Sequence, residues 1–243
     1  MKLQGIRVVD LSQFLPGPHF TMMMADHGAE VIRVEPPGGE PTRSIGARQG
    51  NASVWFRNTH RGKKSVVLDL KRAQGVAAFM ALAASADVVV EAFRPGVVDR
   101  LGIGYAKVAE INPRIVYVSI AAFGQTGPLA KRPAHDVSIQ AESGLLELNR
   151  GANAMPVLPN MPSADMASSL MAMNGVLMAL LRRASTGMGD YIDISMQDSL
   201  VSWLINVVGP AFAEDRDMVL ANERGFGGAA FYNIYACKDG QFL

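Results

Sequence analysis

The feature that most constrains the fold of this sequence is the alternation of short apolar runs with helical stretches along its first half. One helix is methionine-rich and ends at Gly28, and another is expected near residues 73–84. Runs typical of buried strands occupy residues 6–11 (IRVVDL), 31–35, 65–70, 87–92 and 115–120. Strands separated by helices predict βαβ units, and therefore an α/β fold with a mostly parallel sheet.

Ligands of open parallel sheets bind outside the carboxyl ends of the strands. We therefore expect the chemistry of this protein in the loops that follow the predicted strands. These loops begin after Leu11, Glu35, Leu70, Ala92 and Ile120.

The second half of the chain has a different pattern. Ser163 is a good N-cap for a long apolar helix that runs to about Arg183. A strand is expected over residues 191–196 and leads into another helix. The final residues, 225–243, predict a glycine-rich loop followed by a hairpin.

Composition excludes several classes of protein. The net charge of +1 gives no reason to expect binding to nucleic acid or to an anionic membrane surface. The single cysteine, Cys237, rules out an intramolecular disulfide, and the N-terminus resembles a strand rather than a signal peptide. The longest uncharged apolar run, residues 166–181, is short for a bilayer span and predicts a buried helix. We expect a soluble, cytoplasmic protein.

Asp165 is the first candidate for chemistry. It lies two residues after the proposed N-cap, where free backbone N–H groups and the helix dipole favour an anion. A first-turn aspartate often does no more than stabilise its helix. The preceding loop (LPNMPSAD) is long and apolar, however, and a partly desolvated carboxylate gains basicity and nucleophilicity. The helix dipole and burial act on its pKa in opposite directions, and the sequence leaves that balance open.

His135 is the second candidate. It follows a Gly/Pro-containing loop beyond a predicted strand and has Asp136 beside it. An imidazole at such a strand end can move a proton at neutral pH, although it can equally be a residue that starts a helix. No spacing of His, Cys, Asp and Glu suggests a metal site, so we expect no metal.

Basic residues gather in two places. Residues 57–64 (RNTHRGKK) precede a predicted strand, and Arg94 follows another in the run FRPG. Both can meet phosphates at the sheet edge, or form solvated charge clusters. Neither GxGxxG nor GxxxxGK[ST] occurs where a nucleotide site would need it, so we expect no nicotinamide or flavin cofactor.

The sequence resembles the family III CoA-transferases, which include α-methylacyl-CoA racemases and formyl-CoA transferases. The resemblance spans nearly all of residues 3–240. It rests on LQGIRVVDLS, PGP, GAEVIRVEPPGGEPTR, RGKKSVVLDLK, DVVVEAFRPGVVDRLGIGY, NPRIVYVSIAAFGQTGP, SADMASS and TGMGDYIDISMQDS.

This resemblance implies an acyl-CoA-handling enzyme with a Rossmann-like large domain over residues 1–195. Residues 196–243 would then be a linker helix and the incomplete start of a smaller domain. It also implies an interlocked homodimer. In the family the aspartate that matches Asp165 is catalytic: transferases use it to attack an acyl-CoA thioester, and racemases pair it with a histidine to exchange an α-proton.

The racemase branch is favoured because the dipeptide His135-Asp136 and the interval from His135 to Asp165 match it. Formyl-CoA transferase-like members have glutamine where Leu15 stands. The run SIQAESGLL, in contrast, is closer to the transferases. CoA transfer between carboxylic acids through an Asp165 anhydride therefore stays open, as does a catalytically inactive relative that only binds CoA or a partner chain.

For coenzyme A, the resemblance implies contacts from the backbone of Val67, Leu68, Asp69 and Leu70, from the Arg94 side chain, and from the loop of Ala134 to Asp136. Several members grip the nucleotide with an arginine in the place of Pro36, so Arg33 or Arg43 would have to substitute here. Family members also continue beyond Leu243, and the racemases carry a glutamate there that orients the histidine. We therefore expect this chain to be truncated at its C-terminus.

Overall fold

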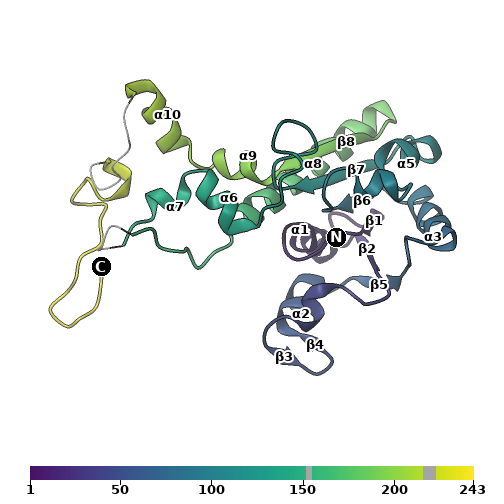
Figure 1. Ribbon diagram of the computed structural model, residues 1–243, viewed down its shortest axis with the longest axis horizontal. Helices are drawn as coiled ribbons and strands as arrows, with labels where there is room; N and C mark the ends of the chain where they lie inside the picture. The colour runs from purple at the N-terminus through teal and green to yellow at the C-terminus, as the bar shows by residue number, and fades with distance from the viewer. Residues whose placement is uncertain (152–154, 216–222) are drawn as a thin grey trace.

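The centre of the molecule is a six-stranded parallel sheet with the order β5-β2-β1-β6-β7-β8 (Figure 1). The computed structural model describes residues 1–151, 155–215 and 223–243. The strands of this sheet are β1 (Arg7–Asp10), β2 (Glu30–Glu35), β5 (Lys64–Val67), β6 (Val88–Glu91), β7 (Val116–Ala121) and β8 (Asp190–Ser195). The predicted α/β fold with an open, mostly parallel sheet is confirmed.

Helices cover both faces of the sheet. Because successive side chains of a strand point to opposite faces, Val8 packs into one apolar cluster and Val9 into the other. The first face carries α1 (Pro16–Asp26), α6 (Asp136–Glu142), α8 (Ser163–Thr186) and α9 (Met196–Val201). The second face carries α3 (Ala73–Ala84), α4 (Val97–Arg100) and α5 (Tyr105–Ile111).

Two regions lie outside these layers. Between β2 and β5 the chain forms η1 (Pro41–Ser44), β3 (Arg48–Gln49), β4 (Ala52–Ser53) and α2 (Val54–His60), and α2 contacts α1. At the other end, α7 (Leu145–Leu148), α10 (Ile205–Glu214), η3 (Arg224–Phe226) and the C-terminal residues extend away from the sheet (Figure 1). Residues 235–243 pair in an antiparallel manner, as the predicted hairpin requires.

The start of α8 differs from the prediction. Ser163 is the first helical residue rather than the cap, and its hydroxyl donates to the carbonyl of Met161. The Asp136 carboxylate accepts the N–H groups of Ala164 and Asp165 instead. Sequence alone could not show this, because the capping group lies 28 residues before Ala164 along the chain.

By length and composition α8 is apolar enough to cross a membrane. In the structure one stripe of the helix packs into the core, so the prediction of a buried helix holds for one face. That stripe comprises Ala164, Ala172, Val176 and Ala179. The opposite face exposes Leu170, Met171, Leu177, Met178 and Leu181.

The predicted division of the chain after residue 195 stays a prediction. Helix α9, which begins at Met196, packs against both α6 and α8. Met196 and Leu200 contribute to the core cluster of the first face.

A buried ionic cluster joins β1 to its neighbours. The Asp10 carboxylate accepts from Thr21 Oγ1 at 2.6 Å and from Lys63 Nζ at 3.1 Å, and Arg33 Nη1 lies 3.4 Å away. Burial alone would raise the pKa of Asp10, but Lys63, Arg33 and the bonded hydroxyls outweigh it and hold the pKa below its usual range.

Three residues of the basic run 57–64 form ion pairs within the protein, a role that differs from both the phosphate site and the solvated cluster considered from the sequence. Lys63 is buried in the Asp10 cluster, Arg61 pairs with Asp26, and Lys64 pairs with Glu30. These three cations anchor the segment before β5 to α1 and to β2.

We expect Lys63→Met to destabilise the protein strongly. Its Nζ also donates to the Pro18 carbonyl at 2.9 Å and to Thr21 Oγ1 at 2.7 Å, and the side chain is 1% exposed. Removing one partner of a buried ion pair costs about 3 to 5 kcal/mol, because the other charge stays buried. Urea-induced unfolding measures this loss.

Lys64→Met is the matched control. Its ammonium is 72% exposed and pairs with Glu30 at the surface. We expect no resolvable change in the unfolding midpoint of this variant. Equal midpoints for the two variants would contradict a structural role for Lys63.

Candidate functional site

The site lies where the chain reverses the direction in which it adds strands to the sheet, between β1 and β6. Strand β1 pairs with both β2 and β6, so the loops after β1 and β6 leave the sheet side by side. Such a switch point forms a crevice beyond the carboxyl ends of the strands. Two cavities occur here, of about 390 Å³ and 470 Å³, and both are lined by Gln13 and Phe93. Cavities therefore occur beyond the strand ends where the sequence predicts the site.

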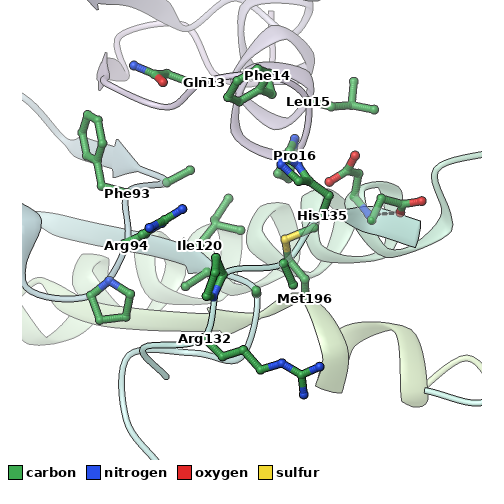
Figure 2. Close-up of a pocket in the computed structure, with 18 of the residues that line it drawn as sticks. Gln13, Phe14, Leu15, Pro16, Phe93, Arg94, Ile120, Arg132, His135 and Met196 are labelled. Atoms are coloured by element: carbon green, nitrogen blue, oxygen red, sulfur yellow. Dashed lines mark hydrogen bonds between the residues drawn. The ribbon is translucent and has the colours of Figure 1, made fainter. Parts of the chain in front are cut away.

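The first cavity brings together residues from seven segments of the chain. Figure 2 shows Gln13 to Pro16 along one side, Phe93 and Arg94 on another, and His135 near Met196. The remaining walls come from Trp55, Ala92, Pro95, Ile120, Ala121, Ala122, Ala130, Arg132, Pro133, Ala134, Asp136, Val137 and Asp165. His135, Asp165, Arg94, Ala134 and Asp136, all predicted from the sequence, thus meet at one cavity.

Asp165 occupies the first turn of α8 and faces this cavity. No donor among the described residues forms a hydrogen bond to its carboxylate, whereas its own N–H donates to Asp136 Oδ1 at 3.1 Å. Burial raises the pKa of Asp165 to about 7, and the negative charge of Asp136 adds to this effect. Burial is the larger of these two causes, and the carboxylate becomes basic enough to take a proton at neutral pH.

Asp136 joins the two candidate residues. Its Oδ1 accepts from the N–H groups of Ala164 at 2.8 Å and of Asp165, and its Oδ2 accepts from Gln140 Nε2 at 2.5 Å. Asp136 follows His135 directly and begins α6. One carboxylate thus fixes the start of α8 relative to the start of α6, and so places Asp165 with respect to His135. The side chain predicted to meet coenzyme A is occupied by these bonds.

His135 is exposed at the N-terminal end of α6. Within the described residues its imidazole has no hydrogen-bond partner, although its carbonyl accepts from Ile139. Figure 2 shows the ring on the same side of the cavity as Leu15 and Pro16. An imidazole held only by its backbone is free to face a substrate in the cavity.

The other buried or partly buried histidines are committed elsewhere. His19 Nδ1 lies 2.8 Å from Ser169 Oγ, between α1 and α8. His60 is stacked on Phe56, and burial together with Lys63 lowers its pKa to about 3. Among the described residues, no three His, Cys, Asp or Glu side chains are grouped to hold a metal ion.

Arg94 brings an unpaired cation to the first cavity. Its guanidinium has no hydrogen-bond or ion-pair partner among the described residues, and the side chain is exposed. The loop that carries it is fixed by Glu91, whose buried carboxylate accepts the Phe93 N–H at 2.7 Å. Burial raises the pKa of Glu91 to about 7. Arg94 is therefore held in place yet available to an anionic ligand.

The second cavity adjoins the first. Leu68, Asp69 and Leu70 line it, together with Lys71, whereas Val67 ends β5 and lines neither cavity. The loop approaches α3 closely, because a Cβ at Gly75 would lie 2.0 Å from the Asp69 carbonyl oxygen. The other walls come from Leu11, Gln13, Val34, Glu35, Pro36, Pro37, Phe93, Val97 and Leu101.

Arg33 cannot substitute for an arginine at position 36. It is 1% exposed and bound to Asp10, so it cannot reach a ligand. Arg43 pairs with Glu35 through bonds of 2.7 and 2.6 Å and stacks on Phe56. Lys71 is the exposed cation that lines this cavity.

Sequence reasoning missed several walls of the cavities. Gln13 and Phe14 fall in the loop after Leu11, which was singled out without naming its residues. Trp55 reaches the cavity only because β3, β4 and α2 fold back toward α1, and no local pattern indicates this. Arg132 lies in the run that contains His135 (Figure 2), but it pairs with Glu142 at 2.5 Å.

Comparison with known proteins places the chain in a family. CoA-transferase family III matches residues 3–243. The chain is 42% identical over 202 residues to acetyl-CoA:oxalate CoA-transferase of Acetobacter aceti, covering 82% of this chain and 52% of that protein. It is 37% identical over 248 residues to human alpha-methylacyl-CoA racemase, covering 100% and 60%.

A solved structure agrees with the sequence relatives. A CAIB/BAIF family protein from Brucella suis matches with a TM-score of 0.90 and 32% identity, covering 99% of this chain and 64% of that one. The chain spans about half the length of the curated relatives it matches. The parallel sheet, the cavity at its switch point and these matches agree, and the chain belongs to CoA-transferase family III.

Proposed function

We propose that the protein racemises 2-methylacyl-CoA thioesters by exchanging the α-proton between His135 and Asp165. The observation that carries this proposal is the meeting of both side chains at one cavity, with the pKa of Asp165 raised to about 7. A carboxylate with this pKa can both take and return a proton near neutral pH. His135 supplies the second acid–base group, and its ring has no hydrogen bond among the described residues that would hold it away from a substrate.

The shared support of the two residues favours proton exchange. Because the Asp136 carboxylate joins the start of α8 to the start of α6, the backbones of Asp165 and His135 are fixed relative to each other. Exchange with inversion needs an acid and a base on opposite sides of one carbon, and therefore a fixed separation between them. The Phe14, Leu15, Ile120 and Met196 side chains make the cavity around them largely apolar.

The residues around both cavities suit an acyl-CoA thioester. Arg94 and Lys71 supply exposed cations for phosphate groups, and the apolar walls of the second cavity suit an adenine or pantetheine group. Leu68, Asp69 and Leu70 would contact coenzyme A from their loop, and Ala134 would do so from the loop before α6. We also propose that Val67 and Asp136 contact coenzyme A. Val67 lines neither cavity, and the Asp136 side chain is bonded to α8.

The alternative is a CoA-transferase that moves CoA between carboxylic acids through a covalent Asp165 intermediate. The 42% identity to acetyl-CoA:oxalate CoA-transferase favours it, as does the transferase-like run at residues 138–146. A partly desolvated carboxylate without hydrogen-bond donors is also a good nucleophile. The transferase uses ionised Asp165 as a nucleophile, and the racemase uses it as a base, so a covalent adduct on Asp165 and the fate of the substrate separate the two reactions.

We further propose that the active form is a homodimer. The outer face of α8 exposes Leu177, Met178 and Leu181, and the C-terminal residues expose Phe212 and Phe231. Exposed apolar surface of this extent is typical of an interface. A second copy of the chain would cover it.

We expect His135→Ala to abolish exchange of the substrate α-proton with deuterium from solvent. The variant loses one of the two acid–base groups, and general acid–base catalysis contributes about 10²- to 10⁴-fold. Mass spectrometry of a methyl-branched acyl-CoA incubated with full-length protein in D₂O measures the loss. His27→Ala, at the far end of α1, is the control and should exchange normally. Normal exchange by His135→Ala would rule out the racemase.

The transferase alternative predicts a covalent adduct. With acetyl-CoA or succinyl-CoA, the donors in the names of the transferase relatives, the Asp165 peptide would gain mass. Hydroxylamine would cleave an aspartyl-CoA thioester, leaving a hydroxamate on the Asp165 side chain and releasing free CoA, and Asp165→Ala would form no adduct. Intact-protein and peptide mass spectrometry detect these changes. If Asp165 stayed unmodified with every donor, the result would favour the racemase over the transferase.

We expect Asp136→Asn to move the acid limb of the pH–rate profile to lower pH. Asp165 must be ionised to accept a proton, so activity falls as the pH drops below the pKa of about 7. Removing the neighbouring negative charge favours the ionised form and lowers that pKa, while burial still holds it above the usual value. The asparagine oxygen can still cap α8. The buried Gln140 Oε1, which has no partner, can accept from the new amide after a flip.

Rates measured over roughly pH 5 to 9 reveal this limb. Asp190→Asn, at an exposed pair with Arg182, is the control and should leave the limb in place. A limb that stays fixed or moves to higher pH in Asp136→Asn would contradict the assigned influence of Asp136.

A further inference from the structure

Phe14 has an unusual backbone conformation at the wall of the first cavity. Its φ is +63°, and the only other non-glycine residue with positive φ among those described is Asp215. A bulky residue is strained in this left-handed region, and such strain persists only where the surroundings enforce it. Phe14 lines the cavity that contains His135 and Asp165, and Figure 2 shows it beside Leu15.

Glu40 provides the enforcing contact. Its Oε1 accepts the Phe14 N–H at 3.0 Å across 26 residues of sequence. Its Oε2 accepts the N–H of Thr42 at 2.8 Å and also the Thr42 hydroxyl. Glu40 is 2% exposed; its bonds to Thr42 are buried and its bond to Phe14 is partly buried. A charge-assisted bond to a backbone N–H is among the stronger hydrogen bonds in a protein.

Glu40 is itself fixed by the wall of the second cavity. Its N–H donates to Glu35 Oε2 at 2.9 Å, and the same carboxylate accepts from Arg43 and from Ser65. Glu35 lines the second cavity, whereas Phe14 lines the first. A continuous series of hydrogen bonds therefore runs from one cavity wall to the other through Glu40.

Arg43 and Lys63 interact with Glu40 electrostatically, but among the described residues neither lies within 4.0 Å of its carboxylate. The ion-pair contact of Glu40 within 4.0 Å among the described residues is with His60, at 4.0 Å. Burial and Lys63 lower the pKa of His60 to about 3, so the imidazole is neutral near pH 7. The carboxylate is satisfied mainly by N–H and hydroxyl donors, and the Phe14 N–H is one of them.

We propose that Glu40 is a positioning residue, which holds Phe14 in its left-handed conformation and so shapes the cavity wall that places the substrate beside Asp165. Its catalytic consequence depends on the acyl-CoA chemistry proposed above, whereas its effect on the Phe14 backbone does not. Glu40 touches neither cavity, so it acts through Phe14.

Glu40→Gln tests this role in the full-length protein. A carboxamide has one acceptor oxygen, so it cannot accept from both Phe14 and Thr42. We expect the KM for the acyl-CoA to rise and kcat/KM to fall by about 10- to 100-fold, because small misplacements of a substrate have effects of this size. The acid limb that reports Asp165 should not move. A purely structural defect would lower kcat through loss of active protein and leave KM unchanged.

Substitutions at Phe14 provide the matched comparison. Phe14→Gly and Phe14→Ala both remove the ring, but only glycine adopts a positive φ without strain. We expect Glu40→Gln to reduce kcat/KM much less in the Phe14→Gly background than in the Phe14→Ala background. Equal losses in both backgrounds would overturn the proposal. Glu30→Gln, which alters a partly exposed glutamate paired with Arg7 and Lys64, is the control for loss of charge.

Amide hydrogen exchange of the peptide that contains residues 13–15 gives a readout without substrate. We expect about tenfold faster exchange in Glu40→Gln and no change in Glu30→Gln, since the Phe14 N–H loses its buried acceptor. Unchanged exchange in Glu40→Gln would overturn the proposal whatever the activity. If the wild-type protein turns over no acyl-CoA, the proposed function fails, and this exchange measurement alone decides the role of Glu40.

Discussion

The buried carboxylate of Asp10 holds the centre of this structure together. It ends β1, the strand that pairs with β2 and β6, and it contacts the next loop through Ser12, α1 through Thr21 and the segment before β5 through Lys63. Burying a charge is unfavourable unless it is paired and fully hydrogen-bonded, so all of these elements must be in place together. The loop after β1 therefore leaves the sheet from a rigid base, and the first cavity is built on that loop.

The protein uses two aspartates in opposite ways. Asp10 is surrounded by cations and hydroxyls, which hold its pKa below the usual range. Asp165 is partly buried without a donor on its carboxylate and has Asp136 beside it, so its pKa rises to about 7. The surroundings make one carboxylate a buried ionic anchor and make the other more basic, because the free side chains are identical.

Hydrogen bonds between distant segments set the geometry of the site. Asp136 joins the start of α6 to the start of α8, and Glu40 joins the segment between β2 and β5 to the loop after β1. Asp136 lies outside α8, whose start it fixes, and Glu40 lies outside the loop after β1, which it fixes. Both transferases and racemases are among the sequence relatives of this chain, so we expect small differences in how such contacts hold His135 and Phe14 to separate the two chemistries.

The sequence by itself determined the parallel α/β sheet, the order of its elements and the loops that carry the site, because hydrophobic periodicity and glycine positions are local signals. It also identified Asp165, His135 and Arg94 through family motifs. The cap on α8, the burial of Arg33 and Lys63, and the strained Phe14 were decided only by the tertiary structure. Each depends on groups brought together from segments far apart in the chain, and the pKa of Asp165 follows from that packing rather than from its neighbours in sequence.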